Sequence, residues 1–501
     1  MRDYTIFIPE FIAAGGALAI IAVDLAWPRV RKDLLAYLCA AIAIGWAVAA
    51  LFYIGKTPNS FQGLIQVDDF TTYFRLLAAG IVFCVALMSP TYLRGRAGNA
   101  AEYYALLLLG CCGLVFMAAA RELITAYISF ELISFLLYIL VGFLRRDIRS
   151  NEASLKFILL GAFASAIFLY GITFIYGATG STYYDSISKA IADHGNGTNV
   201  AIVVGLMLIL VGIGFKLAVV PFQMWAPDAY EGAPLPITAF LSTASEAAGF
   251  ALFLRLFAAA FHSGAEEWRW AIAILAAITM TLGNLVAIQQ TNMKRLIAYS
   301  SIGQVGYMLV VIAAIGYGDT EVGRNASAGL IIHITGYIIS SLLLFTALTA
   351  YYNRTGHDTI RGMRGMAETQ PFLAMVITVS LFSFAGLPFF AGFATKLFMF
   401  QSATSDGLLW LIALAVVNSF ISLYYYLMVV REMYLFDPDE DVKRFRVNPI
   451  LAGLAGVLLL GVLFIGIYPG PVLKGASKAS TPLFQLGADS GSQVTAQLTQ
   501  K

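Results

Sequence analysis

The sequence predicts an all-α polytopic membrane protein with about 14 transmembrane helices, arranged as two inverted five-helix repeats with broken helices 7 and 12. Of the 501 residues, 59% are hydrophobic and only 12% are charged, so the chain is far more apolar than an ordinary soluble domain. Apolar runs of roughly 20 residues, the length that spans a bilayer, recur from one end of the chain to the other. In two of these runs a lysine lies close to a proline or glycine interruption.

The first apolar run lacks a basic region before it and a small-residue cleavage site after it, so we interpret it as a retained span. In order, the predicted spans cover about residues 7–27, 34–54, 72–91, 102–120, 122–144, 153–177, 200–224, 235–262, 269–289, 296–316, 327–351, 372–402, 407–436 and 450–469. They define four regions: residues 1–100 with helices 1–3, residues 101–265 with the first repeat, residues 266–440 with the second, inverted repeat, and residues 441–501 with helix 14 and a polar tail.

The loops are short, apart from residues 178–199 and the tail after residue 475. Neither is long enough for a catalytic domain. The tail segment 487–493 is rich in small polar residues and is expected to be mobile. Function is therefore expected inside the membrane.

Lysine and arginine are about twice as frequent in one set of alternate loops as in the other. Cytoplasmic loops carry such an excess, so both termini are predicted on the non-cytoplasmic side. The pairs Lys294-Arg295 and Arg145-Arg146 lie at the cytoplasmic ends of spans, where they are expected to fix the topology.

The seventh span contains Lys216, which lies five residues before Pro221 in an otherwise apolar run. A proline inside a helix removes a backbone hydrogen bond and bends or breaks the helix, which in a membrane leaves polar backbone beside the charge. The twelfth span repeats the pattern, with the interruption Gly386-Leu387-Pro388 before Lys396. Interrupted spans at matching places in two halves are typical of transporter repeats, and a spacing of five spans makes the halves inverted.

Four ionisable residues fall well inside predicted spans: Glu131, Lys216, Glu246 and Lys396. Each costs about 2.5 to 3.5 kcal/mol at the centre of a bilayer if it has no partner. They must therefore face one another, water or a partner protein. Two interpretations remain open: static ion pairs that hold helices together, or a proton relay whose members change charge state as their neighbours do. Glu131 and Lys216 have opposite charges and are expected to be coupled.

His333 lies between the two lysines in chain order and is a further candidate for the relay, although a lone histidine on an apolar helix is often a packing residue. Four polar residues of the tenth span are expected to carry water or hydrogen bonds between the halves, or to make ordinary interhelical contacts: Tyr299, Ser300, Ser301 and Gln304.

Four other charged residues lie in or near spans, and for the two arginines a role in the relay is the second alternative. We expect Arg75 and Arg255 to extend toward the membrane surface or to pair with lipid phosphate. Glu10 and Asp24, near the ends of the first span, are expected to be solvated or to cap the helix.

Several function classes are excluded. A net charge of +2 without a basic, aromatic-rich run does not favour nucleic-acid binding. No G-x-G-x-x-G motif follows a strand, so no flavin or NAD site is expected. The four cysteines have no ligand-like spacing, so they are interpreted as small core residues and not as metal ligands: Cys39, Cys84, Cys111 and Cys112.

Long motifs around the broken helices resemble those of the proton-translocating, antiporter-like subunits of respiratory complex I. The similarity runs through residues 215–234, 236–242 and 294–304 and from Gly386-Leu387-Pro388 to Lys396, so it covers most of the chain. Among these subunits the chain is most similar to those of about 500 residues without a long carboxy-terminal lateral helix. The resemblance implies that Glu131, Lys216 and Lys396 are the ionisable residues of helices 5, 7 and 12. The chain departs from the family at Glu246, because the family usually has lysine there.

The resemblance further implies a proton-pumping subunit of a complex I-type NAD(P)H- or ferredoxin-quinone oxidoreductase in the bacterial inner membrane. The expected partners are the other membrane-arm subunits, lipids and protons. The chain itself is expected to bind no cofactor, and quinone, flavin and iron-sulfur clusters are expected in partner subunits. The alternatives are an Mrp-type cation/proton antiporter, a structural membrane scaffold and a hydrogenase-linked relative.

Overall fold

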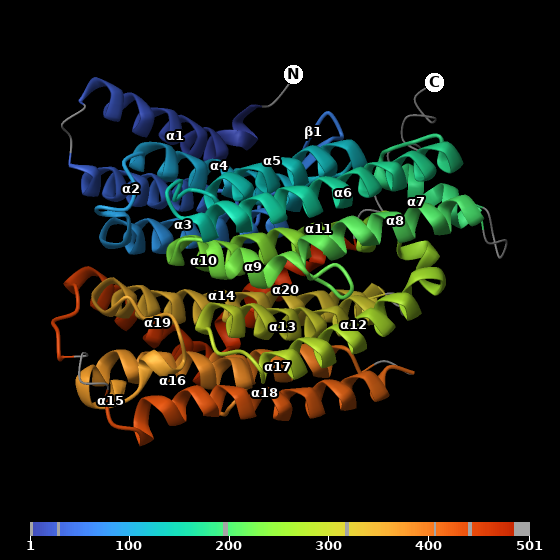
Figure 1. Ribbon diagram of the computed structural model, residues 1–501. Coiled ribbons are helices and arrows are strands. Elements are labelled where there is room, and N and C mark those ends of the chain that lie inside the picture. The colour runs from blue at the N-terminus through green and yellow to red at the C-terminus, as the bar shows by residue number, and fades with distance from the viewer. Residues whose placement is uncertain are drawn as a thin grey trace.

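The computed structural model describes residues 4–27, 31–193, 199–315, 320–404, 407–438 and 443–484, and this part is almost entirely helical. In Figure 1 the long helices lie roughly along one direction, with the blue-to-green half on one side and the yellow-to-red half on the other. The first half consists of the 3-10 turn η1 (Tyr4–Phe7) and the helices α1 (Ile8–Ala26), α2 (Lys32–Leu51), α3 (Asp69–Leu93), α4 (Ala100–Ala119), α5 (Leu123–Val141), α6 (Ile148–Thr179), α7 (Tyr184–Asp193), α8 (Val200–Lys216), α9 (Trp225–Gly232), α10 (Leu235–Phe240) and α11 (Glu246–Ala259).

The second half begins after the 3-10 turn η3 (His262–Gly264). It consists of α12 (Ala265–Ala287), α13 (Met293–Ile315), α14 (Thr320–Thr355), the 3-10 turn η4 (Arg361–Met363), α15 (Met366–Thr369), α16 (Pro371–Ala385), α17 (Ala391–Ser402), α18 (Leu409–Leu435), α19 (Pro449–Ile467), α20 (Gly470–Ser480) and the 3-10 turn η5 (Thr481–Leu483). The all-α membrane fold predicted from the sequence is confirmed.

Within the described ranges, 12 helices are long and apolar enough to cross a membrane, or up to 13 if the bent pair Arg361–Thr369 and Pro371–Ala385 is one span. The predicted count of 14 is therefore not confirmed. The two predicted spans that contain lysines are both interrupted: the chain leaves the helix after α8 in the first, and it breaks between α16 and α17 in the second. Helix α8 is apolar but too short to span a bilayer alone.

Three elements are not anticipated by the hydrophobic pattern. A small antiparallel hairpin, β1 (Asn59–Phe61) and β2 (Ile65–Val67), follows α2. The long loop after α6 contains α7, and the predicted polar tail begins with α20, which packs against α3 and α14. The tail segment predicted to be mobile, residues 487–493, lies outside the described residues.

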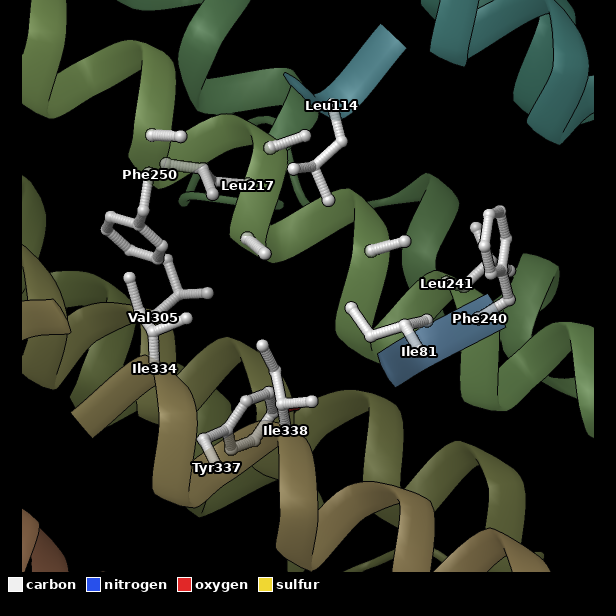
Figure 2. Packing of buried hydrophobic residues seen from close by; sticks show 14 of the residues in the cluster. Ile81, Leu114, Leu217, Phe240, Leu241, Phe250, Val305, Ile334, Tyr337 and Ile338 are labelled. Atoms are coloured by element: carbon white, nitrogen blue, oxygen red, sulfur yellow. The ribbon is translucent and has the colours of Figure 1, made fainter. Parts of the chain in front are cut away.

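The centre of the molecule is the span formed by α10, α11 and the π-helical turn η2 (Leu241–Ser245) between them. Every residue of its apolar window is buried, because it packs against α4 on one side and α14 on the other. Figure 2 shows this span between Leu114 of α4 and two side chains of α14, Ile334 and Ile338. It therefore joins the two halves.

Arg255 of α11 does not extend toward lipid, contrary to the prediction. Its guanidinium is fully buried and makes two hydrogen bonds of 2.7 and 2.8 Å to the carboxylate of Asp68, which is also fully buried. The same carboxylate caps α3 by accepting from the backbone of Thr71, and Arg255 also donates to the Ala118 carbonyl at the end of α4. This group ties α11 to α3 and α4.

Arg75 of α3 is also buried, so the prediction of a lipid-facing side chain is wrong here too. It donates two hydrogen bonds of 2.7 Å to Glu10 in the first turn of α1. Glu10 is buried, so solvation, one of the two environments predicted for it, is wrong. Asp24, at the other end of α1, contacts Lys32 at the start of α2. The buried Arg75 and Glu10 thus pair with each other, and Arg75 also donates to the Ile6 carbonyl, because a buried charge needs a partner within the protein.

The Asp68–Arg255 pair leads to a stability prediction. Asp68→Asn keeps a residue that can cap α3 but leaves the buried guanidinium without its carboxylate, which should cost about 3 to 5 kcal/mol. Thermal unfolding of the protein purified in detergent measures this loss. The matched control is Asp33→Asn, since Asp33 binds the exposed Arg94 and should contribute only about 0 to 1 kcal/mol. Equal unfolding temperatures for the two variants would contradict a stabilising role of the buried pair.

Candidate functional site

The first broken span ends its helix at Lys216. Ala218 follows in the left-handed region at φ 54°, where a residue with a side chain is strained, and Pro221 cannot continue a helix. The polar groups freed by the break still find partners. The Val220 amide donates to the Thr279 hydroxyl at 3.1 Å, and the Trp225 indole donates to the Phe215 carbonyl at 2.7 Å. The break is therefore a fixed, hydrogen-bonded part of the fold.

Lys216 is buried at this break. Its ammonium donates to the Ser134 hydroxyl of α5 at 3.0 Å and lies 5.4 Å from the ring centre of Phe130. Its aliphatic part lies beside Gly249 of α11, where an added methyl group would come within 3.5 Å of the lysine chain. The side chain thus extends between α5 and the central span.

Glu131 is only half-buried, and among the described residues the Lys216 ammonium has Ser134, not Glu131, as its hydrogen-bond partner. It lies one helical turn before Ser134, the partner of Lys216, and it accepts a hydrogen bond from Ser165 of α6. The surrounding face of α5 and α6 carries exposed apolar side chains: Ile128, Phe135, Phe163 and Tyr170. The predicted coupling of Glu131 with Lys216 is therefore not a direct contact.

Glu246 begins α11, directly after the π-helical turn η2. One carboxylate oxygen accepts hydrogen bonds from Ser301 and, at 3.2 Å each, from Tyr230 and Tyr337. These hydroxyls come from α13, α9 and α14, so residues from both halves of the chain meet at one carboxyl group. The other oxygen is buried, with no hydrogen-bond partner within the described part of the chain.

The second broken span interrupts its helix at Gly386, whose φ of 84° suits glycine. The carbonyl of Phe384, freed by the break, accepts from Lys396 at 2.8 Å and from Gln304 at 3.0 Å. The Gly392 amide, in the first turn of α17, donates to the Ser383 hydroxyl at 2.9 Å. Here the ammonium of the buried lysine itself donates to the backbone carbonyl that the break leaves free.

The Lys396 ammonium also lies 4.6 Å from the ring centre of Tyr307 and 3.3 Å from the Ser419 hydroxyl. His333 of α14 is close by, because its Nδ1 forms a 3.0 Å hydrogen bond with the hydroxyl of Thr395, the residue before this lysine. The His333 Nε2 atom is buried and has no hydrogen-bond partner among described residues. His333 therefore belongs to the Lys396 group in space.

One face of α13 connects the groups around Glu246 and Lys396. Ser301 bonds to Glu246, Gln304 shares the Phe384 carbonyl with Lys396, and Tyr307 lies against the ammonium of that lysine. Residues three apart lie on one side of a helix, so this spacing places all three on the same line. Tyr307 was missed in the sequence, although its spacing from Ser301 and Gln304 is the signal that would have found it.

The remaining polar predictions for this helix have simpler outcomes. Ser300 bonds to the Tyr426 hydroxyl, and Tyr299 is half-buried.

All four cysteines are buried and form no disulfide bond. Among the residues that the structure describes, no three His, Cys, Asp or Glu side chains are placed to hold a metal ion.

Comparison with known proteins gives concordant matches. Residues 120–422 match the family described as NADH:quinone oxidoreductase/Mrp antiporter, TM. The NADH-quinone oxidoreductase subunit N of Moorella thermoacetica is 38% identical over 484 residues, which cover 97% of this chain and 100% of that protein. A chain of respiratory complex I from Thermus thermophilus with bound aureothin is similar at 30% identity and a TM-score of 0.78, covering 94% of this chain and all of that one. A chain of the Mrp complex from Dietzia shares the fold, with 21% identity, a TM-score of 0.79 and coverage of 95% and 98%.

The start of α17 leads to a prediction about the second broken span. Gly392→Ala would place a methyl group 1.6 Å from the Ser383 carbonyl oxygen, so α17 and Lys396 must move. We expect a loss of at least about 1 to 3 kcal/mol, measured by thermal unfolding and by the yield of folded protein. Gly456→Ala in α19, where no atom lies within 4 Å of the added methyl group, is the control and should be neutral. Wild-type stability of Gly392→Ala would show that this close approach is not required.

Proposed function

The chain belongs to the NADH:quinone oxidoreductase/Mrp antiporter family of membrane proteins, and we propose that it is the proton-translocating subunit N of a complex I-type quinone oxidoreductase. In this role it holds no redox centre. Quinone, flavin and iron-sulfur clusters belong to partner subunits, which release the redox energy. This chain converts that energy into proton movement across the membrane.

The observation that carries this proposal is the succession of buried ionisable groups through the middle of both halves. Lys216 lies at the first helix break, Glu246 at the junction of the halves, and Lys396 with His333 at the second break. The α13 face of Ser301, Gln304 and Tyr307 links the last two positions. Buried ionisable residues in a membrane are costly, and proton pathways are one of the functions that use them.

In the proposed mechanism, the charge of one group changes the free energy of protonating the next. Charges interact strongly across a low-dielectric interior, so a proton that leaves Lys216 alters the energy at Glu246 and then at Lys396. Hydroxyls that both donate and accept, such as Ser134 and Ser301, conduct protons when water joins them. The hydrogen-bonded helix breaks hold both lysines at fixed positions while their charge changes.

Glu131 is the group through which we propose that partner subunits act. It is half-buried on an apolar face of α5 and α6, where a neighbouring membrane-arm subunit replaces lipid. A charge that approaches Glu131 changes the field at Lys216, because Ser134 contacts this lysine one turn further along α5. The loop charges support an orientation in the bacterial inner membrane with both termini outside and proton uptake from the cytoplasm.

An Mrp-type cation/proton antiporter is the second candidate, favoured by the shared fold of the Dietzia chain. The two functions require different partner subunits. Purification of the tagged chain in mild detergent should recover flavin and iron-sulfur subunits. Recovery of antiporter subunits without redox cofactors would support the second candidate instead.

Replacement of Lys216 tests the relay directly. Lys216→Ala should lower proton pumping at least about tenfold, since a positioned proton-transfer group typically contributes 10²-fold or more. Pumping is measured by dye quenching in membrane vesicles supplied with NADH and a short-chain quinone. Lys189→Ala, which changes an exposed lysine of α7, should have no effect. Normal pumping by the assembled Lys216→Ala complex would exclude this residue from the relay.

The hydroxyl cluster around Glu246 predicts an asymmetry between two substitutions. Glu246→Lys should assemble and pump within a few-fold of wild type, because hydroxyl oxygens of Tyr230, Ser301 and Tyr337 can accept from an ammonium as well as donate to a carboxylate. Glu246→Leu has similar bulk but no ionisable group, and it should lose pumping about tenfold or more. The same vesicle assay compares them, and equal activity of both variants would contradict a protonic role at this position.

A further inference from the structure

Lys294, in the first turn of α13, is the buried charge for which the proposed relay has no role. The sequence predicts that it fixes topology at the cytoplasmic surface, but only 7% of the residue is exposed. Its ammonium donates to the backbone carbonyls of Glu231 and, at 3.1 Å, Ala233 at the end of α9. A helix carboxyl end carries partial negative charge, so this position suits a cation.

The partners of Lys294 differ from those of its neighbour. Arg295 binds the carboxylates of Asp228 and Glu231 at 2.8 and 2.9 Å, as a surface cation does. No carboxylate among the described residues lies within ion-pair distance of the Lys294 ammonium. The charged groups that face it from further away are Asp358, Glu231, Asp147 and Arg149. A simple topology anchor would not require a buried amine held by carbonyl groups alone.

A surface pocket lies next to the Lys294 site, because it is lined by Arg295, the following residue, and by Glu231. It has a volume of about 290 Å³, and its charged lining residues are Arg149, Glu152, Lys156, Asp228, Glu231 and Arg295. Glu231 belongs to both places, because its carboxylate lines the pocket and binds Arg295 while its carbonyl accepts from Lys294. The last turn of α9 thus contributes both to the wall of this pocket and to the carbonyl site that holds the buried amine.

The inner side of the same two helices leads to Glu246. Tyr230, next to Glu231 in α9, donates to the Glu246 carboxylate. Ser301 also bonds to this carboxylate and lies seven residues after Lys294 in α13, which is two turns on the same face and a rise of about 10 Å. Lys294 therefore lies between a polar surface pocket and the central carboxyl group.

We propose that Lys294 is the uptake group that passes protons from this pocket to Glu246, an inference that rests on the proposed function. The neutral amine takes a proton from water in the pocket, which is reprotonated from the bulk solvent, and the ammonium then passes a proton through water to the Glu246 carboxylate, which becomes the carboxylic acid. No other bond changes, and the residue returns to its first state after each transfer. The carbonyls of α9 hold the amine in place without an ion pair that would fix its charge.

Two substitutions test the proposal in assembled complexes. Lys294→Met keeps the chain length but removes the amine, and Lys294→Arg keeps a cation that can reach the same carbonyls but does not release its proton. Both should lower NADH-driven proton pumping at least about tenfold. A purely structural role predicts that Lys294→Arg restores pumping. Lys189→Met, an exposed substitution in α7, is the control and should pump normally.

The outcomes separate this proposal from the proposed function. Normal pumping by Lys294→Met, or rescue by Lys294→Arg, would overturn the uptake role. If Lys294→Met does not assemble, Lys294→Arg decides alone. If Lys216→Ala abolishes pumping while the Lys294 variants pump normally, only this inference fails. If neither site affects pumping, the proposed function fails as well.

Discussion

Polar groups that are cut off from water must find their partners within the protein, and this constraint determines much of the structure. It accounts for the hydrogen bonds at both helix breaks, where side chains satisfy the backbone carbonyls that the breaks leave free. The Trp225 indole donates to the Phe215 carbonyl in the first break. In the second break, Lys396 and Gln304 both donate to the Phe384 carbonyl. An unsatisfied backbone group in such surroundings costs several kcal/mol, so the breaks persist only because neighbouring helices supply partners.

The two halves use different donors for the backbone carbonyl that each break leaves free, and this difference affects how each lysine is bound. In the first half an indole donates to the freed backbone carbonyl, and the serine hydroxyl is the one hydrogen-bond partner of Lys216 within the described ranges. In the second half the lysine itself donates to the freed backbone carbonyl, so a loss of its proton would also alter the hydrogen bonds at the break. The two lysines are equivalent in sequence pattern but not in structure. A proton at Lys396 is therefore coupled more directly to the geometry of its helix.

The local features of the fold could be read from the sequence, while the long-range pairs could not. Apolar runs and the breaks near Pro221 and Gly386 depend on neighbouring residues, so pattern and propensity predict them. The Asp68–Arg255 pair joins residues from distant parts of the chain, and each alone resembles a surface charge near a span. The burial of Lys294 depends on where α9 ends against α13. Short elements such as β1, α7 and α20 also lack a strong periodic signal.

The π-helical turn before Glu246 limits how the length of this segment can differ among homologues. A π turn accommodates one more residue than the α-helical turn it replaces, so it is equivalent to a single-residue insertion inside an otherwise regular span. Deleting that residue would leave a continuous helix but rotate everything on one side of it by about 100° relative to the other side. Glu246 would then face away from Ser301. Homologues of this chain should therefore tolerate changes of side chain in this segment far more readily than changes of length.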